Sequence, residues 1–406
     1  MATERIAPPG AQELHSASMR TSLVTVLLAT DVVFNFAFYL VMPMLARHLV
    51  ENLALAAWVG GVILGIRNLS HQGLFPVGGL LAERFGARTV MVAGCLLRAA
   101  AFSGFGFATG FAALTCFAAA AGFAGALFTP AMKALLAETH ESERTQLFAR
   151  SETLQQVGAL AGPAAGIGLT QFGFETIATV GAVVFLIWGI VLLWFLGSDG
   201  TRAADRDATL ERMKWYEYLG FHPRLFRFSL LTIVYVAMFN QLYFCLPLSL
   251  AQAMPQWSSG TLFMAFGGAI LLAYRPLRRV FEDGGSADLR LALGYAVMGV
   301  GWLPLLLPWP SPLMGGIHLL VAAVQGIGSL IAYPAIMALI PRIVDEQRLA
   351  VAFGLFYTVA WGLGGVLVNI VSGWLFEESS TVLWAVLVAS AIAHSAYFYA
   401  KQPHAS

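Results

Sequence analysis

Four ionisable side chains lie where an apolar chain makes them costly. Asp31, Arg67 and Arg98 each interrupt a long hydrophobic run, and Glu152 lies near the start of another. A charged side chain at the centre of a bilayer costs about 2.5–3.5 kcal/mol on insertion scales, so such a group is neutral, paired or in contact with water. A buried carboxyl group can either hold a proton or pair with an arginine. These four residues are therefore candidates for proton coupling.

The same pattern allows other interpretations. Asp31 could form a fixed ion pair with one of the two arginines, and such a pair would only orient the helices. Glu152 could be a second titrating acid, or it could pair with Arg144 or Arg150 at the membrane interface. Beyond the central polar segment no acid or base lies deep in an apolar run, so we expect coupling in the first half of the chain.

The elements that position these residues are predicted to be membrane helices. Of the 406 residues only 11% are charged and 58% are hydrophobic, whereas a soluble domain has about 25% charged residues. A spanning helix needs about 20 apolar residues. Twelve such runs cover residues 21–45, 56–80, 89–109, 111–135, 146–171, 176–196, 226–250, 259–280, 290–308, 312–340, 348–375 and 381–400. We therefore predict an all-α membrane protein with twelve transmembrane helices.

The longest polar connection divides these helices six and six. The predicted parts are a tail (1–20), a six-helix bundle (21–196), a central loop (197–225), a second six-helix bundle (226–400) and a short tail (401–406). With these spans nearly all basic residues outside the helices fall on one side, and the opposite loops hold only Arg47. The positive-inside rule then places both termini in the cytoplasm. We expect a multi-pass protein of the cytoplasmic (inner) membrane.

The two halves also repeat in sequence. The segment GFAGALFTPAMKALLAE from Gly122 aligns without a gap to GIGSLIAYPAIMALIPR from Gly326, at an offset of 326 − 122 = 204, and Pro130 meets Pro334. Convergence of helices rich in Gly, Ala and Leu is the alternative explanation. Parallel repeats of six helices place a substrate site at their interface and work by alternating access.

The connection GGLLAERFGAR between the second and third runs contains Gly79, Glu83, Arg84, Gly86 and Arg88. Their spacing resembles the gating motif of the major facilitator superfamily. Glu83 stands where the family usually has Asp. This resemblance implies a twelve-helix fold of two pseudo-symmetric halves. It also implies that the motif packs against the eleventh helix when the cytoplasmic side is closed.

The second motif, GALAGPAAG in the fifth run, resembles the antiporter motif of proton-driven exporters in this superfamily. It contains Gly158, Gly162, Pro163 and Gly166. Ordinary close packing of small residues is the alternative. The fourth run lacks the arginine usual in drug:proton antiporters. Arginines in the second and third helices instead make the chain similar to the MdtH type of multidrug exporters.

The resemblance also implies which residues line the substrate cavity. Mostly apolar walls with a few polar groups suit amphiphilic ligands. From the first, seventh, tenth and eleventh helices the candidates are Asn35, Phe38, Tyr39, Asn240, Gln241, Tyr243, Gln325, Tyr357 and Trp361. The aromatic members could equally face lipid.

These features predict a secondary transporter that exports amphiphilic small molecules or drugs in exchange for protons, with a role in antibiotic resistance. Export of an endogenous siderophore or lipid-like metabolite is the alternative. An intramembrane enzyme is disfavoured because no HExxH motif is present, and a non-transporting receptor would not need a buried acid with two buried arginines. We expect a monomer that uses the proton gradient, with no cofactor, metal or nucleic-acid partner.

Overall fold

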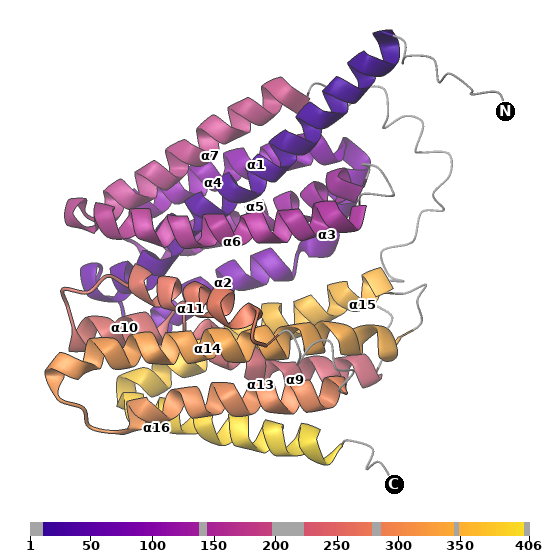
Figure 1. Cartoon of the computed structure of the whole chain (residues 1–406). Helices are drawn as coiled ribbons and strands as arrows, with labels where there is room; N and C mark the ends of the chain where they lie inside the picture. The colour runs from indigo at the N-terminus through magenta and orange to yellow at the C-terminus, as the bar shows by residue number, and fades with distance from the viewer. Residues whose placement is uncertain (1–10, 138–143, 197–222, 278–285, 345–348, 402–406) are drawn as a thin grey trace.

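The computed structural model describes residues 11–137, 144–196, 223–277, 286–344 and 349–401. Within these ranges the chain is helical and contains no strand, so the all-α prediction is confirmed. Figure 1 shows two layers of roughly parallel helices, with α1 to α7 in one layer and α9 to α16 in the other. The division into two helical halves is therefore visible directly in the arrangement of the ribbons.

The first half begins with α1 and ends with α7. Its helices are α1 (Ala11–Arg47), α2 (Ala57–Gln72), α3 (Phe75–Phe85), α4 (Ala87–Phe107), α5 (Phe111–Ala137), α6 (Arg144–Leu169) and α7 (Phe174–Leu196). The π-helical turn η1 (His48–Asn52) extends α1, and the short 3-10 helix η2 (Thr170–Phe172) joins α6 to α7.

The second half contains α9 (Pro223–Asn240), α10 (Cys245–Ala253), α11 (Gly260–Tyr274), α13 (Ala287–Trp302), α14 (Ser311–Leu339), α15 (Leu349–Phe356) and α16 (Gly364–Ala400). Two 3-10 segments, η3 (Leu303–Leu306) and η4 (Ile340–Arg342), follow α13 and α14. The π-helical segment η6 (Tyr357–Leu363) joins α15 to α16 without a break in the helical backbone.

The observed helices correspond to the twelve predicted runs. Among the described residues, eight helices are long and apolar enough to cross a membrane. The last of these, Ala352–Ala400, contains two predicted spans, because the backbone of Ser379 is extended (φ −168°, ψ 114°) and divides α16. Three predicted spans are missing from the eight because α2 and α3 are separate short helices, α6 has a polar first half, and α11 has only 15 residues.

The helix ends differ from two predicted boundaries. The tail predicted for residues 1–20 is partly helical, since α1 begins at Ala11. The second half begins at Pro223, inside the segment predicted as the central loop. Residues 197–222, which are the rest of that loop, lie outside the described ranges, as do residues 1–10 and 402–406.

The bundle has two ends, which the chain itself defines. We call the end at which α1 begins and α16 finishes the terminal end, and the opposite end the far end (Figure 1). At the far end Arg47 donates through Nη1 to the carbonyl oxygen of Trp257 (3.2 Å) and through Nη2 to that of Pro255 (2.9 Å). The backbone N–H of Ala57 donates to Oε1 of Glu377. These bonds tie the two halves together at the far end.

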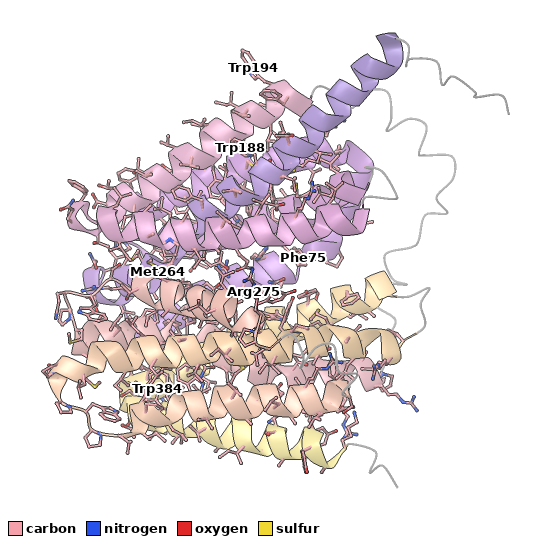
Figure 2. All side chains as sticks on the ribbon, viewed as in Figure 1. Phe75, Trp188, Trp194, Met264, Arg275 and Trp384 are labelled. Atoms are coloured by element: carbon pink, nitrogen blue, oxygen red, sulfur yellow. The ribbon has the colours of Figure 1, made fainter. Side chains whose placement is uncertain are left out.

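The outer surface of the bundle is apolar, as lipid requires. Trp194 on α7 is 84% exposed and projects from the outer edge of the first half (Figure 2). Trp384 is 2% exposed and stacks on Trp302 within the second half, with 5.2 Å between ring centroids. A large exposed aromatic residue such as Trp194 is stable at this position if it contacts acyl chains or headgroups rather than water.

Candidate functional site

A cavity of about 450 Å³ lies between the two halves. Residues of α1, α2 and α6 form its wall in the first half, and residues of α9, α11, α14, η6 and α16 form much of the opposite wall. Six of the nine residues predicted for a substrate cavity line it, namely Phe38, Tyr39, Asn240, Tyr243, Tyr357 and Trp361. The structure thus brings these six side chains together from both halves.

The other three predicted wall residues do not line this cavity. Each uses its side-chain amide to hydrogen-bond within the packed helices instead. Asn35 donates to the carbonyl oxygen of Asp31 (2.9 Å), Gln241 to the hydroxyl of Ser372 (2.9 Å) and Gln325 to the carbonyl oxygen of Met298 (2.8 Å). These amide groups therefore satisfy hydrogen-bond acceptors inside the protein. The sequence alone does not distinguish this role from contact with a ligand.

One face of α2 supplies polar wall residues that the sequence analysis did not select. These are Asn68, His71 and Gln72, which line the cavity beside Arg67. Their positions relative to Arg67 are i+1, i+4 and i+5, so they lie on one side of a helix. That spacing within an apolar run was the signal that could have identified them.

Hydrogen-bonded tyrosines cross the cavity wall. The hydroxyls of Tyr39 and Tyr243 lie 3.0 Å apart, and those of Tyr333 and Tyr357 lie 2.8 Å apart. The hydroxyl of Tyr235 donates to Ser329 (3.3 Å). The wall is therefore rich in aromatic rings, and the hydroxyls of these tyrosines already form hydrogen bonds within the protein.

Three helices are interrupted at the cavity. Helix α2 ends at Gln72 and α3 starts at Phe75, and residues 241–244 separate α9 from α10. Pro76 and Pro247 follow these breaks and cannot donate a backbone hydrogen bond to the preceding turn. The third interruption is the π-helical segment η6, which carries Tyr357 and Trp361. Such irregular segments are frequent at functional sites in helices.

Asp31, the buried acid of the first helix, contacts α6. Its side chain is 4% exposed, and the hydroxyl of Ser151 donates to Oδ2 at 2.6 Å. The predicted pairing with Arg67 or Arg98 is not formed in this conformation, because no ion pair within 4.0 Å joins them. The physical reason is rotation of α1, which turns Asp31 toward α6. Glu152 follows Ser151 on α6, and its side chain lies outside the described part of the structure.

Arg98 is buried without an acidic partner in the described residues. Its side chain is 1% exposed, and Nη2 donates to the carbonyl oxygen of Ala121 at 2.9 Å. Its Cζ atom lies 4.6 Å from the ring centroid of Phe34, 5.3 Å from that of Phe38 and 5.7 Å from that of Phe185. Cation–π contacts of this kind contribute about 2 kcal/mol or more when desolvated. Aromatic faces and one carbonyl therefore hold this charge.

Arg67 differs from Arg98 because it lines the cavity. Its Cζ atom lies 5.4 Å from the ring centroid of Phe38, and its Nη2 donates to Oδ1 of Asn68. Its Nη1 is buried and has no hydrogen-bond partner in the described residues. Phe38 thus lies near both guanidinium groups, and only Arg67 offers a donor at the cavity wall.

The glycines of the predicted antiporter motif pack α6 against α1. A Cβ atom on Gly158 would clash with the carbonyl oxygen of Val32, and one on Gly162 would lie 2.9 Å from the nitrogen of Leu40. A Cβ on Gly166 would lie 3.0 Å from the carbonyl oxygen of Leu40. Small residues four apart allow this close approach of backbones.

Pro163 brings the same helix to the second half. A Cβ atom on Gly260, at the start of α11, would lie 2.9 Å from the carbonyl oxygen of Pro163. The motif therefore contacts α1 on one side and α11 near the far end. A role in exchange stays a prediction, but its position at a contact between the halves is established by this geometry.

The predicted gating motif spans the end of α3 and the start of α4. Gly86 lies between these helices with φ +88°, a conformation that glycine adopts readily and other residues rarely adopt. A Cβ atom on Gly79 would meet nothing within 4 Å, whereas one on Gly78 would clash with the carbonyl oxygen of Ala126 on α5. In this conformation it is therefore Gly78, and not Gly79, that must lack a side chain so that α3 can pack against α5.

The charged members of the motif lie at the end of α3 and on the first turn of α4. Arg84 is exposed and lies over the ring of Phe85, with 5.3 Å from Cζ to the centroid, and Arg88 is on the first turn of α4. The side chain of Glu83 lies outside the described part of α3. Figure 2 shows Phe75 where the halves meet, and its ring centroid is 5.7 Å from that of Tyr357. Packing against the eleventh helix stays a prediction for the closed state.

Comparison with known proteins assigns this architecture to a family. The family model for the Major Facilitator Superfamily matches residues 27–283, which is more than half of the chain. The chain belongs to the major facilitator superfamily. It is accordingly a multi-pass membrane transporter and not an enzyme.

Relatives in this superfamily match over nearly the whole length. An uncharacterised MFS-type transporter of Mycobacterium tuberculosis is 29% identical over 377 residues, covering 89% of each chain. The multidrug resistance protein MdtH of Salmonella arizonae is 27% identical over 363 residues, covering 88% of this chain and 86% of the relative. These matches agree with the resemblance to MdtH-type exporters found from the sequence.

Solved transporter structures share the fold at lower identity. A crystal structure of the nucleoside transporter NupG is similar with a TM-score of 0.74 and 15% identity, covering 94% of this chain and all of that one. A POT family transporter in complex with 5-aminolevulinic acid has a TM-score of 0.76 and 12% identity, covering 93% and 95%. At these identities the likeness establishes the arrangement of helices alone.

Proposed function

We propose that this transporter exports amphiphilic small molecules across the cytoplasmic membrane in exchange for protons, with both termini in the cytoplasm. The observation that carries the proposal is the cavity between the halves, whose wall is rich in aromatic and other apolar residues and also holds polar groups. Such walls suit ligands with an apolar body and a polar group. The similarity to multidrug resistance proteins MdtH, which covers 86–88% of this chain, supports export as the direction of transport.

Proton coupling is proposed to reside at Asp31. The hydroxyl of Ser151 donates to this carboxyl group and thereby links α1 to α6, the two helices that the glycines of α6 hold together. Protonation of Asp31 would change that hydrogen bond at a close helix contact. Because α1 and α6 also form part of the cavity wall, the change reaches the substrate site through adjacent residues of the same helices.

The test uses inside-out vesicles with an acidic interior and a pH-sensitive dye inside. Cationic, neutral and anionic amphiphiles are added in turn, and alkalinisation of the interior is followed. Wild type is expected to exchange protons for substrate, and Asp31→Asn is expected to lose this exchange. Asp288→Asn is the matched control, since that carboxylate lies in the second half and pairs with Lys401 at 3.8 Å.

Two outcomes would contradict the proposal. If labelled substrate accumulates in wild-type vesicles while the internal pH does not change for any compound, the transporter is not proton-coupled. If Asp31→Asn folds, transports and still exchanges protons as wild type does, coupling resides at another residue. Size-exclusion chromatography and circular dichroism of the purified variant verify folding before either result is interpreted.

A further inference from the structure

Polar residues of α2 that line the cavity carry hydrogen-bonding atoms without partners among the described residues. Arg67 lines the cavity, and its Nη1 has no hydrogen-bond partner in the described residues. One turn further along, Nε2 of His71 and Oε1 of Gln72 also lack partners there. Buried polar atoms in folded proteins nearly always have a hydrogen-bond partner. Because a guanidinium group can only donate, the group that completes Arg67 must be an acceptor.

No carboxylate of the described cavity wall neutralises this charge. The lining residues within the described ranges include Arg67 and His71 but no Asp or Glu. Arg98 lies behind the wall, and its guanidinium shares the ring of Phe38 with Arg67, at 5.3 and 5.4 Å from the centroid. Asp31 accepts a hydrogen bond from Ser151 on α6, and among the described residues no ion pair within 4.0 Å joins it to either arginine. Among the described lining residues, the first-half wall therefore holds a guanidinium group and no carboxylate.

The remaining wall is suited to an organic body rather than to a small inorganic ion. Phe239, Phe263, Phe266 and Trp361 line the second-half side of the same cavity. Charged ligands that fit here must place their apolar part against these rings and their polar part toward α2. The guanidinium group of Arg67 attracts an anionic group and repels a cationic one, so this part of the wall favours a ligand with a negative charge.

We propose that the cavity binds amphiphilic organic anions, with the carboxylate or other anionic group on Arg67 and the apolar body against the second-half aromatic residues. Arginine binds planar carboxylates through two parallel hydrogen bonds, and Nη1 supplies a free donor for such a bond. The inference rests on the proposed function in one respect, namely that this cavity is the site of the transported ligand. It adds the charge of the substrate, which the aromatic wall alone does not decide.

The first test compares three ligands that share one ring and differ only in charge. Naphthaleneacetate, naphthaleneacetamide and naphthylethylamine are titrated into wild-type transporter in nanodiscs of zwitterionic lipid, and heats of binding are recorded by calorimetry. Charge-assisted hydrogen bonds are stronger than neutral ones, so the carboxylate is expected to bind about tenfold or more tighter than the amide. The amine is expected to bind most weakly. Equal binding of the three, or tightest binding of the amine, overturns the proposal.

Substitution of Arg67 assigns the preference to this residue. In Arg67→Gln the carboxylate should lose its advantage over the amide, whereas Arg67→Lys should keep part of it because the charge remains. Arg227→Gln is the matched control, since that arginine is exposed on α9 and does not line the cavity. An unchanged carboxylate preference in folded Arg67→Gln contradicts the proposal. If that variant fails to fold, Arg67→Lys and the wild-type order of affinities still decide the question.

Failure of this inference is distinguishable from failure of the proposed function. Carboxylate-selective binding that depends on Arg67, without any substrate-dependent proton exchange, supports the anion site and contradicts antiport. Proton exchange that occurs with cationic compounds only, and is unaffected by Arg67→Gln, supports antiport and contradicts the anion site. Both experiments use the full chain in a bilayer, so the two results are directly comparable.

Discussion

The hydroxyl groups of Tyr39 and Tyr243 lie 3.0 Å apart and join the first half of the transporter to the second. These residues are 243 − 39 = 204 positions apart, which is the offset at which the two halves repeat in sequence. They are therefore equivalent positions of the first and seventh helices. A single hydrogen bond connects symmetry-related residues at the cavity, where the halves must separate during alternating access.

Removing this bond should shift the balance between conformations. A hydrogen bond contributes about 0.5–1.5 kcal/mol net, so Tyr39→Phe or Tyr243→Phe is expected to move the conformational equilibrium by about two- to tenfold. The double variant should show little further change, because either substitution alone breaks the bond. Spin-label distances between α3 and α15 measure the populations. Additive effects of the two substitutions would indicate that the hydroxyl pair does not link the halves.

The helices and their division into two halves could be predicted because the length of each apolar run and the offset between the repeated segments can be read from a single sequence. Phe38, Tyr243 and Trp361, which the sequence analysis selected for a cavity wall, do line the cavity between the halves, and their role toward substrate stays a prediction. The sequence could not decide which way a helix is rotated. The sequence therefore predicted an arginine partner at similar depth for Asp31. In the structure, the packing of α1 turns Asp31 toward Ser151 instead.

Helix packing and local backbone breaks explain the other differences. Gln241 and Gln325 have the residue type of a ligand-binding amide, but the packed helices use them internally. Gly78 and Gly79 are adjacent in the chain, and only contact with α5 determines that the first one needs to lack a side chain. The breaks after Gln72 and Asn240 depend on nearby prolines, which the sequence contains but hydropathy averages over.

The glycines of α6 should be intolerant of added side-chain atoms where α1 is close. Gly158→Ala and Gly162→Ala each place a Cβ against the backbone of α1, and overpacking of this kind costs about 1–3 kcal/mol. Gly168→Ala is the control on the same helix, because a Cβ there meets nothing within 4 Å. Thermal unfolding in detergent should show lower midpoints for the first two variants only. Equal midpoints for all three would mean that α1 and α6 do not approach this closely.

The contacts of Arg47 should hold the far end closed. Arg47→Ala removes two hydrogen bonds to carbonyl oxygens of the second half and its ion pair with Glu51 (2.7 Å), so the open state of that end becomes more populated. A cysteine introduced by Leu64→Cys in the cavity wall, with Cys116 replaced by Ser, reports the opening through its rate of alkylation by an impermeant maleimide.

The expected increase in alkylation is about tenfold, since hydrogen bonds from a charged group contribute about 1.5–3 kcal/mol. Arg224→Ala serves as the control, because that arginine is exposed at the start of α9. A rate no faster in Arg47→Ala than in the control would show that the far end is closed by apolar packing alone, for example by the contact of Gly61 with the backbone of Asn369.

Ser151 should affect proton exchange through Asp31 without being essential for it. Ser151→Ala removes the donor that lies 2.6 Å from the carboxyl oxygen, and a hydrogen bond to a charged group contributes about 1.5–3 kcal/mol. Proton exchange in inside-out vesicles is therefore expected to slow by about tenfold, whereas Asp31→Asn should abolish it. Ser229→Ala is the matched control, since that buried hydroxyl donates only to the carbonyl oxygen of Leu225 on its own helix (2.9 Å). Exchange as fast in Ser151→Ala as in Ser229→Ala would mean that the link between α1 and α6 takes no part in coupling.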